Sequence, residues 1–282
     1  MNNFSFAAWL RLLLLYAKMD FRWLLHDRLF AVISVSADIL SNLAAVSGVY
    51  MLAARFSQIG GITREEIFFM LSYTTLLTGV YQMFFAANNV GHISRRIGRG
   101  QVEHMLLQPV PLPVQLLCEG FNPFSGTGNF WMGVLLMHLA LKKLELSLSI
   151  GQIALLAGFL LLSVILLIAL SYLAASLTFY APVQTEEISS FVIDALSLLA
   201  EYPLSGMPVG LVLPLVSLFP AGLLGWFPCL AVLGKTPLSL PVWLPAVVST
   251  AFCALASYFF RKGLKYYAQK GYNRYVSIGH RR

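Results

Sequence analysis

Three acidic residues interrupt stretches of this sequence that are otherwise apolar enough to lie inside a membrane. Asp38 lies between Leu29 and Ala54, and Asp194 and Glu201 lie seven residues apart in a later stretch. A charged side chain is costly in lipid, so such residues are expected to face a protein interior or a water-filled cavity. Two interpretations stay open here: a polar lining for a substrate path or a proton relay, and hydrogen bonding between helices.

Other polar residues share faces with these acids. Four polar residues of the first stretch follow an i, i+4, i+7, i+8 pattern, and four residues of the stretch from Ile67 to Val90 repeat it. These two sets are Ser34, Asp38, Ser41, Asn42 and Thr74, Thr78, Tyr81, Gln82. Glu187 extends the face of Asp194 and Glu201 by another seven residues. The candidate translocation-path residues are Asp38, Asn42, Thr78, Gln82, Asp194 and Glu201.

The longest polar interruption runs from His92 to Pro113 and is predicted to be a loop with one short amphipathic helix. Its prolines at 109, 111 and 113 should end any helix there. The apolar residues Ile93, Ile97, Val102, Met105 and Leu106 can anchor this helix on the membrane domain, while its polar residues face the cytoplasm. The segment is either a solvated face that only sets topology or a docking helix for a soluble partner.

Composition excludes a soluble enzyme. Of the 282 residues, 58% are hydrophobic and only 11% are charged, against about 25% charged in ordinary globular proteins. The net charge of +7 comes from residues that flank apolar stretches, which is typical of membrane orientation and not of nucleic-acid binding. Gly234, Lys235 and Thr236 resemble the end of a phosphate-binding loop, but Cys229 occupies the position of its first glycine. No metal-ligand cluster or catalytic motif is present, so we expect no active site and no cofactor in this chain.

The pattern predicts an all-α polytopic membrane protein with six transmembrane helices in a single domain, residues 1–282. An amphipathic helix at 4–28 is expected to lie along the interface, although a first spanning helix is an alternative. The six spans are expected at 29–54, 67–90, 126–141 with an upstream extension through 114–119, 153–178, 188–202 and 242–260. The proline-broken segment 203–241 is expected to be re-entrant and external, and 261–282 to be a basic cytoplasmic tail.

The distribution of Lys and Arg supports six spans. With a cytoplasmic N-terminus, six spans place 14 of the 19 basic residues inside, whereas a seventh span would place only 8 inside. The positive-inside rule therefore favours six spans with both termini in the cytoplasm, and we expect a bacterial inner membrane.

The loop after the second span resembles that of type-2 ATP-binding-cassette permeases, which has the form I-x-x-G-x-[hydrophobic]-[acid]-x-x-L-[hydrophobic]-x-P. The overall plan is also similar, with a Tyr202-Pro203 pair and a Phe-Pro-Ala sequence at 219–221. The matching loop residues are Ile97, Gly100, Val102, Glu103, Leu106, Leu107 and Pro109.

This resemblance implies an exporter in which two permeases, identical or sibling, dock on two separate ATPases that hold ATP and Mg. By the resemblance, Arg96, Gly100, Glu103 and Leu106 belong to the coupling helix and Pro109 ends it. The full set of candidate coupling residues is Arg95, Arg96, Arg99, Gly100, Gln101, Glu103, His104 and Leu106. Membrane lipid is a further expected partner, and nucleic acid is not.

Two other functions are weighed. An ion-coupled secondary transporter would use Asp38 or Asp194 as a titrating group and would need no nucleotide. A membrane-embedded lipid enzyme is disfavoured because the sequence lacks nucleophile and metal sets.

Overall fold

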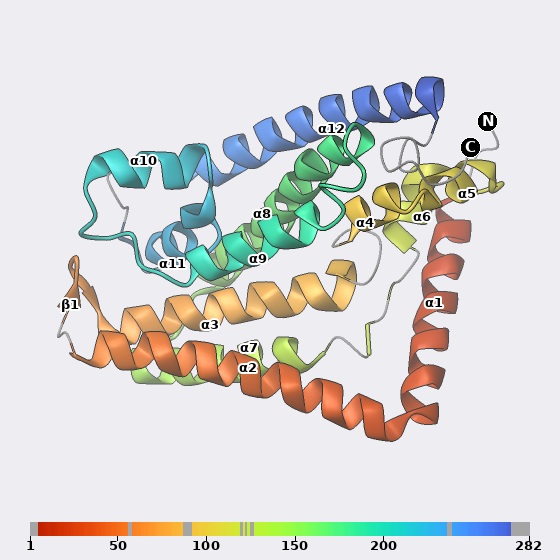
Figure 1. The fold of residues 1–282 in the computed structure, drawn as a ribbon. Helices are drawn as coiled ribbons and strands as arrows, with labels where there is room; N and C mark the ends of the chain where they lie inside the picture. The colour runs from red at the N-terminus through yellow and green to blue at the C-terminus, as the bar shows by residue number, and fades with distance from the viewer. Residues whose placement is uncertain are drawn as a thin grey trace.

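The computed structural model describes residues 5–55, 58–86, 92–118, 121, 123–124, 127–235 and 239–271. Apart from one short hairpin, the described chain is all-α, as predicted. The long helices run side by side, and α1 (Phe6–His26) runs across their direction (Figure 1). This placement of α1 suits a helix that lies along a membrane surface, and its bounds match the predicted segment 4–28.

In the described part of the chain, three helices are long and apolar enough to cross a membrane: Arg64–Phe85, Ile150–Phe179 and Leu244–Lys270. They correspond to α3 (Arg64–Tyr81) with the π-helical η1 (Gln82–Ala86), to α8 (Ile150–Ala175) with η2 (Ser176–Phe179), and to α12 (Leu244–Lys270). A capping box of Thr63 and Glu66 begins α3, directly after the hairpin of β1 (Gln58–Ile59) and β2 (Ile62–Thr63). The predicted second, fourth and sixth spans are therefore confirmed as helices of sufficient length.

The other three predicted spans are not among the helices that meet this test of length and composition. The first predicted span is a helix, α2 (Arg28–Arg55), but α7 (Gly128–Lys143) has 16 residues and α9 (Ile188–Ala200) has 13. Thirteen residues give roughly 20 Å of helix, less than the hydrocarbon core of about 30 Å. Because turns occupy 182–187, α9 does not begin before Pro182 and cannot span alone. The count of six spans stays a prediction.

The upstream extension of the third span is wrong. Residues from Leu112 to Cys118 form a separate short helix, α6 (Leu112–Cys118), and α7 begins at Gly128. The prolines at 109 and 111 end the preceding helix as predicted, but Pro113 stands at the second position of α6, where a missing N–H costs nothing.

The proline-broken segment forms α10 (Val209–Ser217), the turn η3 (Ala221–Leu223) and α11 (Trp226–Val232). The helices Val209–Ser217 and Ala221–Val232 are bent by 74° relative to each other across the break at residues 218–220. Such a bend is compatible with the predicted re-entrant loop and equally with one broken span. The segment packs its buried Leu223, Leu224 and Phe227 into the core, against α8 and α9.

Small residues let α3 and α7 approach closely. A Cβ atom added at Gly133 would lie 2.5 Å from Leu76 Cα, and one added at Gly79 would lie 2.3 Å from the backbone nitrogen of Phe130. Close backbone approach at glycine is a common way for helices to associate in membranes. The α3–α7 pair thus has close backbone contact, and it is the most extensive contact between two of the described elements.

We expect Gly133→Ala to destabilise the protein by about 1 to 3 kcal/mol, because the added methyl group must displace backbone. Thermal unfolding of the purified protein in detergent measures this as a lower midpoint. Gly158→Ala is the matched control, since Gly158 lies on α8 with open space around it. An unchanged midpoint for Gly133→Ala would contradict the close packing.

Candidate coupling segment and polar cavity

The segment after α3 folds into two short helices, α4 (Ile93–Gly98) and α5 (Gln101–Leu107). The prediction of a single helix is therefore wrong. Gly100 has a φ of 72°, a conformation that suits glycine, and it separates the two helices as the N-cap of α5. Both helices lie at the end of the bundle where α12 ends (Figure 1). We call residues 92–107 the coupling segment.

Apolar side chains anchor the coupling segment as predicted. Ile93 and Ile97 are fully buried, and Val102 and Met105 are 2% and 3% exposed. They join a cluster that includes Phe179 of η2 and residues from α6, α8 and α12. Leu106 is an exception: it is 47% exposed, so its predicted role as an anchor is wrong, and it stays available for a partner.

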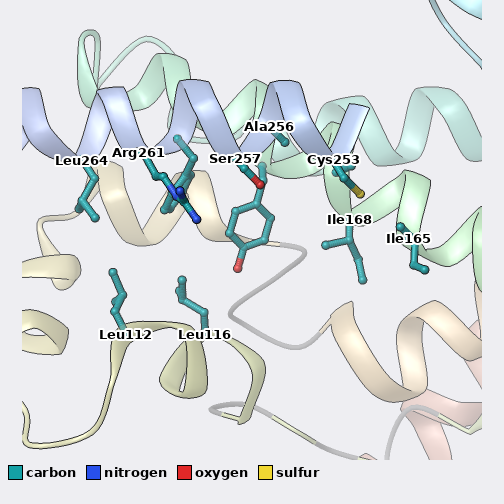
Figure 2. Close-up of a pocket in the computed structure, with 12 residues that line it drawn as sticks. Leu112, Leu116, Ile165, Ile168, Cys253, Ala256, Ser257, Arg261 and Leu264 are labelled. Atoms are coloured by element: carbon teal, nitrogen blue, oxygen red, sulfur yellow. The ribbon is translucent and has the colours of Figure 1, made fainter. Parts of the chain in front are cut away.

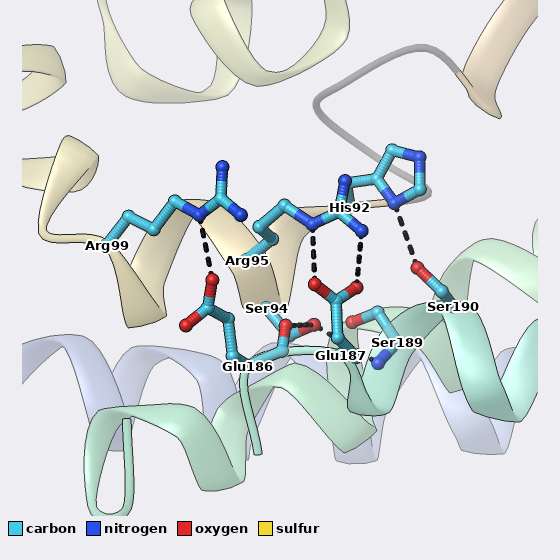
Figure 3. A network of polar contacts seen from close by, with 8 residues as sticks. All are labelled: His92, Ser94, Arg95, Arg99, Glu186, Glu187, Ser189 and Ser190. Carbon is cyan, nitrogen blue, oxygen red and sulfur yellow. Dashed lines mark hydrogen bonds and ion pairs between the residues drawn. The ribbon is translucent and has the colours of Figure 1, made fainter. Parts of the chain in front are cut away.

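Arg95 of α4 and Arg99, the C-cap residue of this helix, form ion pairs within the chain (Figure 3). Arg95 donates two hydrogen bonds to Glu187, at 2.7 and 2.6 Å, and Arg99 donates one to Glu186 at 2.7 Å. The hydrogen bonds from Arg95 hold the pKa of the Glu187 carboxyl below its ordinary value. The expectation that both arginines simply face the cytoplasm is thus corrected: they are partly exposed, but they bind the turn that precedes α9.

Buried serines reinforce the same contact. The Ser94 hydroxyl donates to the Glu186 carbonyl at 2.7 Å and accepts from the Ser189 backbone N–H at 3.2 Å. The Ser189 hydroxyl in turn donates to the carbonyl of Ser171 on α8 at 3.1 Å. All three serines are fully buried, where each satisfied hydrogen bond also avoids a desolvation penalty. At Gly98, an added Cβ atom would lie 2.9 Å from the carbonyl oxygen of Pro182, so α4 packs directly on this turn.

His92 adds a polar contact at the start of α4. Its Nδ1 lies 2.8 Å from the Ser190 hydroxyl (Figure 3). Burial lowers the pKa of His92, and the neighbouring Arg95 lowers it further. The imidazole is therefore neutral at physiological pH, so this contact is a hydrogen bond between uncharged groups.

The outer face of α5 carries the remaining candidate coupling residues. Gln101, Glu103 and His104 are exposed, and Leu107 is 85% exposed. Glu103 also accepts a hydrogen bond of 3.2 Å from the Tyr267 hydroxyl of α12. Arg96, on α4, is half-buried and makes contacts of its own. The face of α5 thus combines polar groups with an exposed leucine pair, as a protein-binding surface requires.

A polar cavity of about 340 Å³ lies between α3, η1 and α9. Four of the six candidate path residues line it: Thr78, Gln82, Asp194 and Glu201. Asp38 and Asn42 belong to α2, but their side chains lie outside the described residues. Glu187 does not share this lining, since it lies before α9 and binds Arg95. The structure therefore brings together polar stripes from two distant parts of the sequence.

The set of candidate path residues left out four polar residues that line the cavity: Tyr81, His92, Ser190 and Ser197. Tyr81 belongs to the predicted polar stripe of Thr78 and Gln82, whose i, i+3, i+4 spacing places all three residues on one face. Its hydroxyl is buried and has no hydrogen-bond partner among the described residues. Gln82 begins the π-helical turn, a deviation that is frequent at functional sites, and its side-chain oxygen accepts from Asn129.

The polar cavity carries groups that can bind a ligand. It holds two carboxylates, hydroxyls and an amide, and no Lys or Arg of the described residues lines it. Among the described residues, no group of three or more His, Cys, Asp or Glu side chains could hold a metal ion. Such a cavity can bind water and hydrogen-bonding or positively charged groups.

Comparison with known families decides the assignment. A family model described as "ABC-2 family transporter protein" matches residues 40–271, which is most of the chain. The chain belongs to the ABC-2 family of transporter proteins. No curated protein and no solved structure shows significant similarity to it.

Membership in the ABC-2 family settles the broad function. The chain is a membrane-embedded permease component of a transporter, and proteins of this family are generally not catalytic themselves. The family also implies partnership with an ABC ATPase. The predicted relation of this chain to type-2 ATP-binding-cassette permeases is thereby confirmed.

We expect Glu187→Gln to weaken the attachment of α4 to the turn before α9. An exposed ion pair contributes up to about 1 kcal/mol, so its loss should make amide hydrogen exchange in α4 up to about fivefold faster. Amide hydrogen exchange of residues 93–98 in the purified protein measures this. The pair is intact at neutral pH and is lost as pH falls through the lowered pKa of Glu187, so strong acid should have the same effect.

The exchanged pair Arg95→Glu with Glu187→Arg should restore slow exchange. Glu145→Gln, at a turn outside the coupling segment, serves as the control. If Glu187→Gln leaves exchange in 93–98 unchanged, the ion pair does not hold α4 in place.

Proposed function

We propose that this chain is the permease subunit of an ATP-driven exporter, and that the coupling segment docks on a separate cytoplasmic ATPase. ATP and Mg bind to that ATPase and not to this chain. Two permeases, identical or sibling, form the translocation path. The observation that carries the proposal is that one helix, α9, is bound to α4 at its N-terminus and lines the polar cavity along its length.

The contacts suggest how force is transmitted. Partner closure displaces α5, and the buried cluster around Ile97 carries α4 along because close-packed side chains transmit displacement. Arg95, Ser94 and Arg99 then pull on residues 186–189 at the start of α9. Movement of α9 changes the positions of Asp194 and Glu201, and the cavity alternates between the two sides of the membrane.

The placement of charge supports a cytoplasmic coupling segment in a bacterial inner membrane. Seven basic residues lie at the end that holds α4, α5 and the end of α12: Arg95, Arg96, Arg99, Arg261, Lys262, Lys265 and Lys270. Five basic residues lie at the opposite end, near the start of α3: Arg55, Arg64, Lys142, Lys143 and Lys235. The excess at the end of the coupling segment agrees with the positive-inside rule if that segment and both termini are cytoplasmic.

We expect Leu107→Asp to abolish co-purification of the ATPase from native membranes. Docking through the exposed leucines of α5 would have to remove water from the new carboxylate, which is unfavourable. Leu146→Asp, in the turn after α7 and outside the coupling segment, should leave the association intact. Thermal unfolding of both variants checks that each is folded. Retention of the ATPase by folded Leu107→Asp would refute docking through α5.

We further propose that the polar cavity is part of the path and favours positive charge. In a chain whose Cys118, Cys229 and Cys253 are replaced by Ala, Ser197→Cys should react faster with a cationic methanethiosulfonate than with an anionic one. The two carboxylates of the cavity attract the cation, so adding Asp194→Asn and Glu201→Gln should remove most of that ratio. The proposal is contradicted if Ser197→Cys with both carboxylates intact reacts equally fast with the two reagents. It is also contradicted if this variant reacts with neither reagent.

An ion-coupled secondary transporter remains the second candidate, because Asp194 and Glu201 line one cavity. The two functions differ in their energy source. Reconstituted transport that needs ATP and persists without an ion gradient supports the exporter. Transport driven by an ion gradient without nucleotide, and lost in Asp194→Asn, supports the secondary transporter.

A further inference from the structure

An apolar groove lies between α6, α8 and α12, apart from the polar cavity (Figure 2). Its volume is about 400 Å³. Leu112 and Leu116 of α6 line one side of the groove, opposite Leu264 and Arg261 of α12 (Figure 2), and Ile168 of α8 and Phe260 of α12 also line it. A groove of this composition binds hydrocarbon and not a polar solute.

One end of the groove carries positive charge. Arg261 lines the groove and also lines an adjacent hollow with Lys262 and Lys265. All three side chains are exposed, and none has a carboxylate partner within the described residues. The apolar groove therefore opens beside a cluster of three cations that lacks compensating charge.

The dimensions of the groove match one leaflet of a bilayer. Its lining residues on α12 extend from Cys253 to Leu264, which is roughly 16 Å along the helix axis. Half of the hydrocarbon core is about 15 Å thick. The three cations lie toward the C-terminal end of α12, where its sequence becomes basic. Lipid headgroups are expected at this level of the helix.

We propose that this groove binds one anionic phospholipid. An acyl chain lies between α6, α8 and α12, and the headgroup phosphate binds Arg261, Lys262 and Lys265. Charge complementarity favours an anionic over a zwitterionic lipid.

The position of the groove gives the lipid a structural role. Leu116 lines the groove and also belongs to the buried cluster of Ile93 and Ile97. A bound acyl chain therefore contacts α12 on one side. On the other side it contacts α6, which packs against the coupling segment through Leu116. The lipid would stabilise the position of α6 relative to α12.

Native mass spectrometry of the full-length chain, after equilibration in mixed phosphatidylglycerol and phosphatidylcholine, tests the proposal. We expect at least one retained phosphatidylglycerol. Arg261→Gln should lower its preference over phosphatidylcholine by about fivefold, as expected for one basic residue at a membrane surface. Adding Lys262→Gln and Lys265→Gln should lower the preference further.

Filling the groove separates this site from general surface attraction. Ser257→Trp, at an exposed position that lines the groove, should reduce retention of both lipids, whereas Val247→Trp, exposed on the same helix outside the groove, should not. Thermal unfolding checks that both variants are folded. Equal retention of the two lipids by the parent, or unchanged retention in Ser257→Trp, would overturn the proposal. Dissociation of a dimer by Ser257→Trp with unchanged lipid would assign the groove to a second copy and would also overturn it.

Discussion

The attachment of α4 to the start of α9 is the contact on which the rest of the account depends. Ile93 and Ile97 hold α4 on the bundle by their burial against α6, α8, η2 and α12, since a fully buried aliphatic side chain contributes about 1.5 to 3 kcal/mol. The ion pairs of Arg95 and Arg99 are exposed and contribute less, but their fixed geometry sets the orientation of α4. Apolar burial therefore holds the segment, and the polar contacts align it.

This attachment joins two surfaces that would otherwise be independent. On one side, α5 presents an exposed leucine pair and polar groups to the solvent. On the other side, α9 presents Asp194 and Glu201 to a polar cavity. Because α9 is too short to span alone and follows a turn, its position is set by its neighbours and not by the membrane. A short, neighbour-dependent helix is a suitable element for carrying movement from a docking surface to a path.

The sequence predicted what depends on local pattern. Proline positions and hydrophobic periodicity placed the long helices, the start of α9 and the anchoring isoleucines correctly. Thr78 and Gln82 of the predicted polar stripe line one cavity, because helical spacing decides which residues share a face. Glu187 was assigned to the wrong face, since its spacing from Asp194 looked helical although α9 begins only at Ile188.

The remaining features depend on contacts that periodicity cannot show. The partner of Arg95 lies 92 residues away, and Ser94 meets Ser189 across 95 residues. The split into α4 and α5 depends on a single positive φ at Gly100, which a glycine permits but does not require. The cavity and the lipid groove arise only when helices from different parts of the chain pack together.

The most direct measurement joins α4 to α9 covalently and asks whether the transporter still works. In a background in which the three native cysteines are replaced, Arg95→Cys and Glu187→Cys are connected by a short flexible bifunctional cross-linker. In the complex with its ATPase, the account predicts that ATP hydrolysis and transport continue after cross-linking, because the two helices move as one body. Loss of both activities on cross-linking, with recovery when the linker is cleaved, would contradict it.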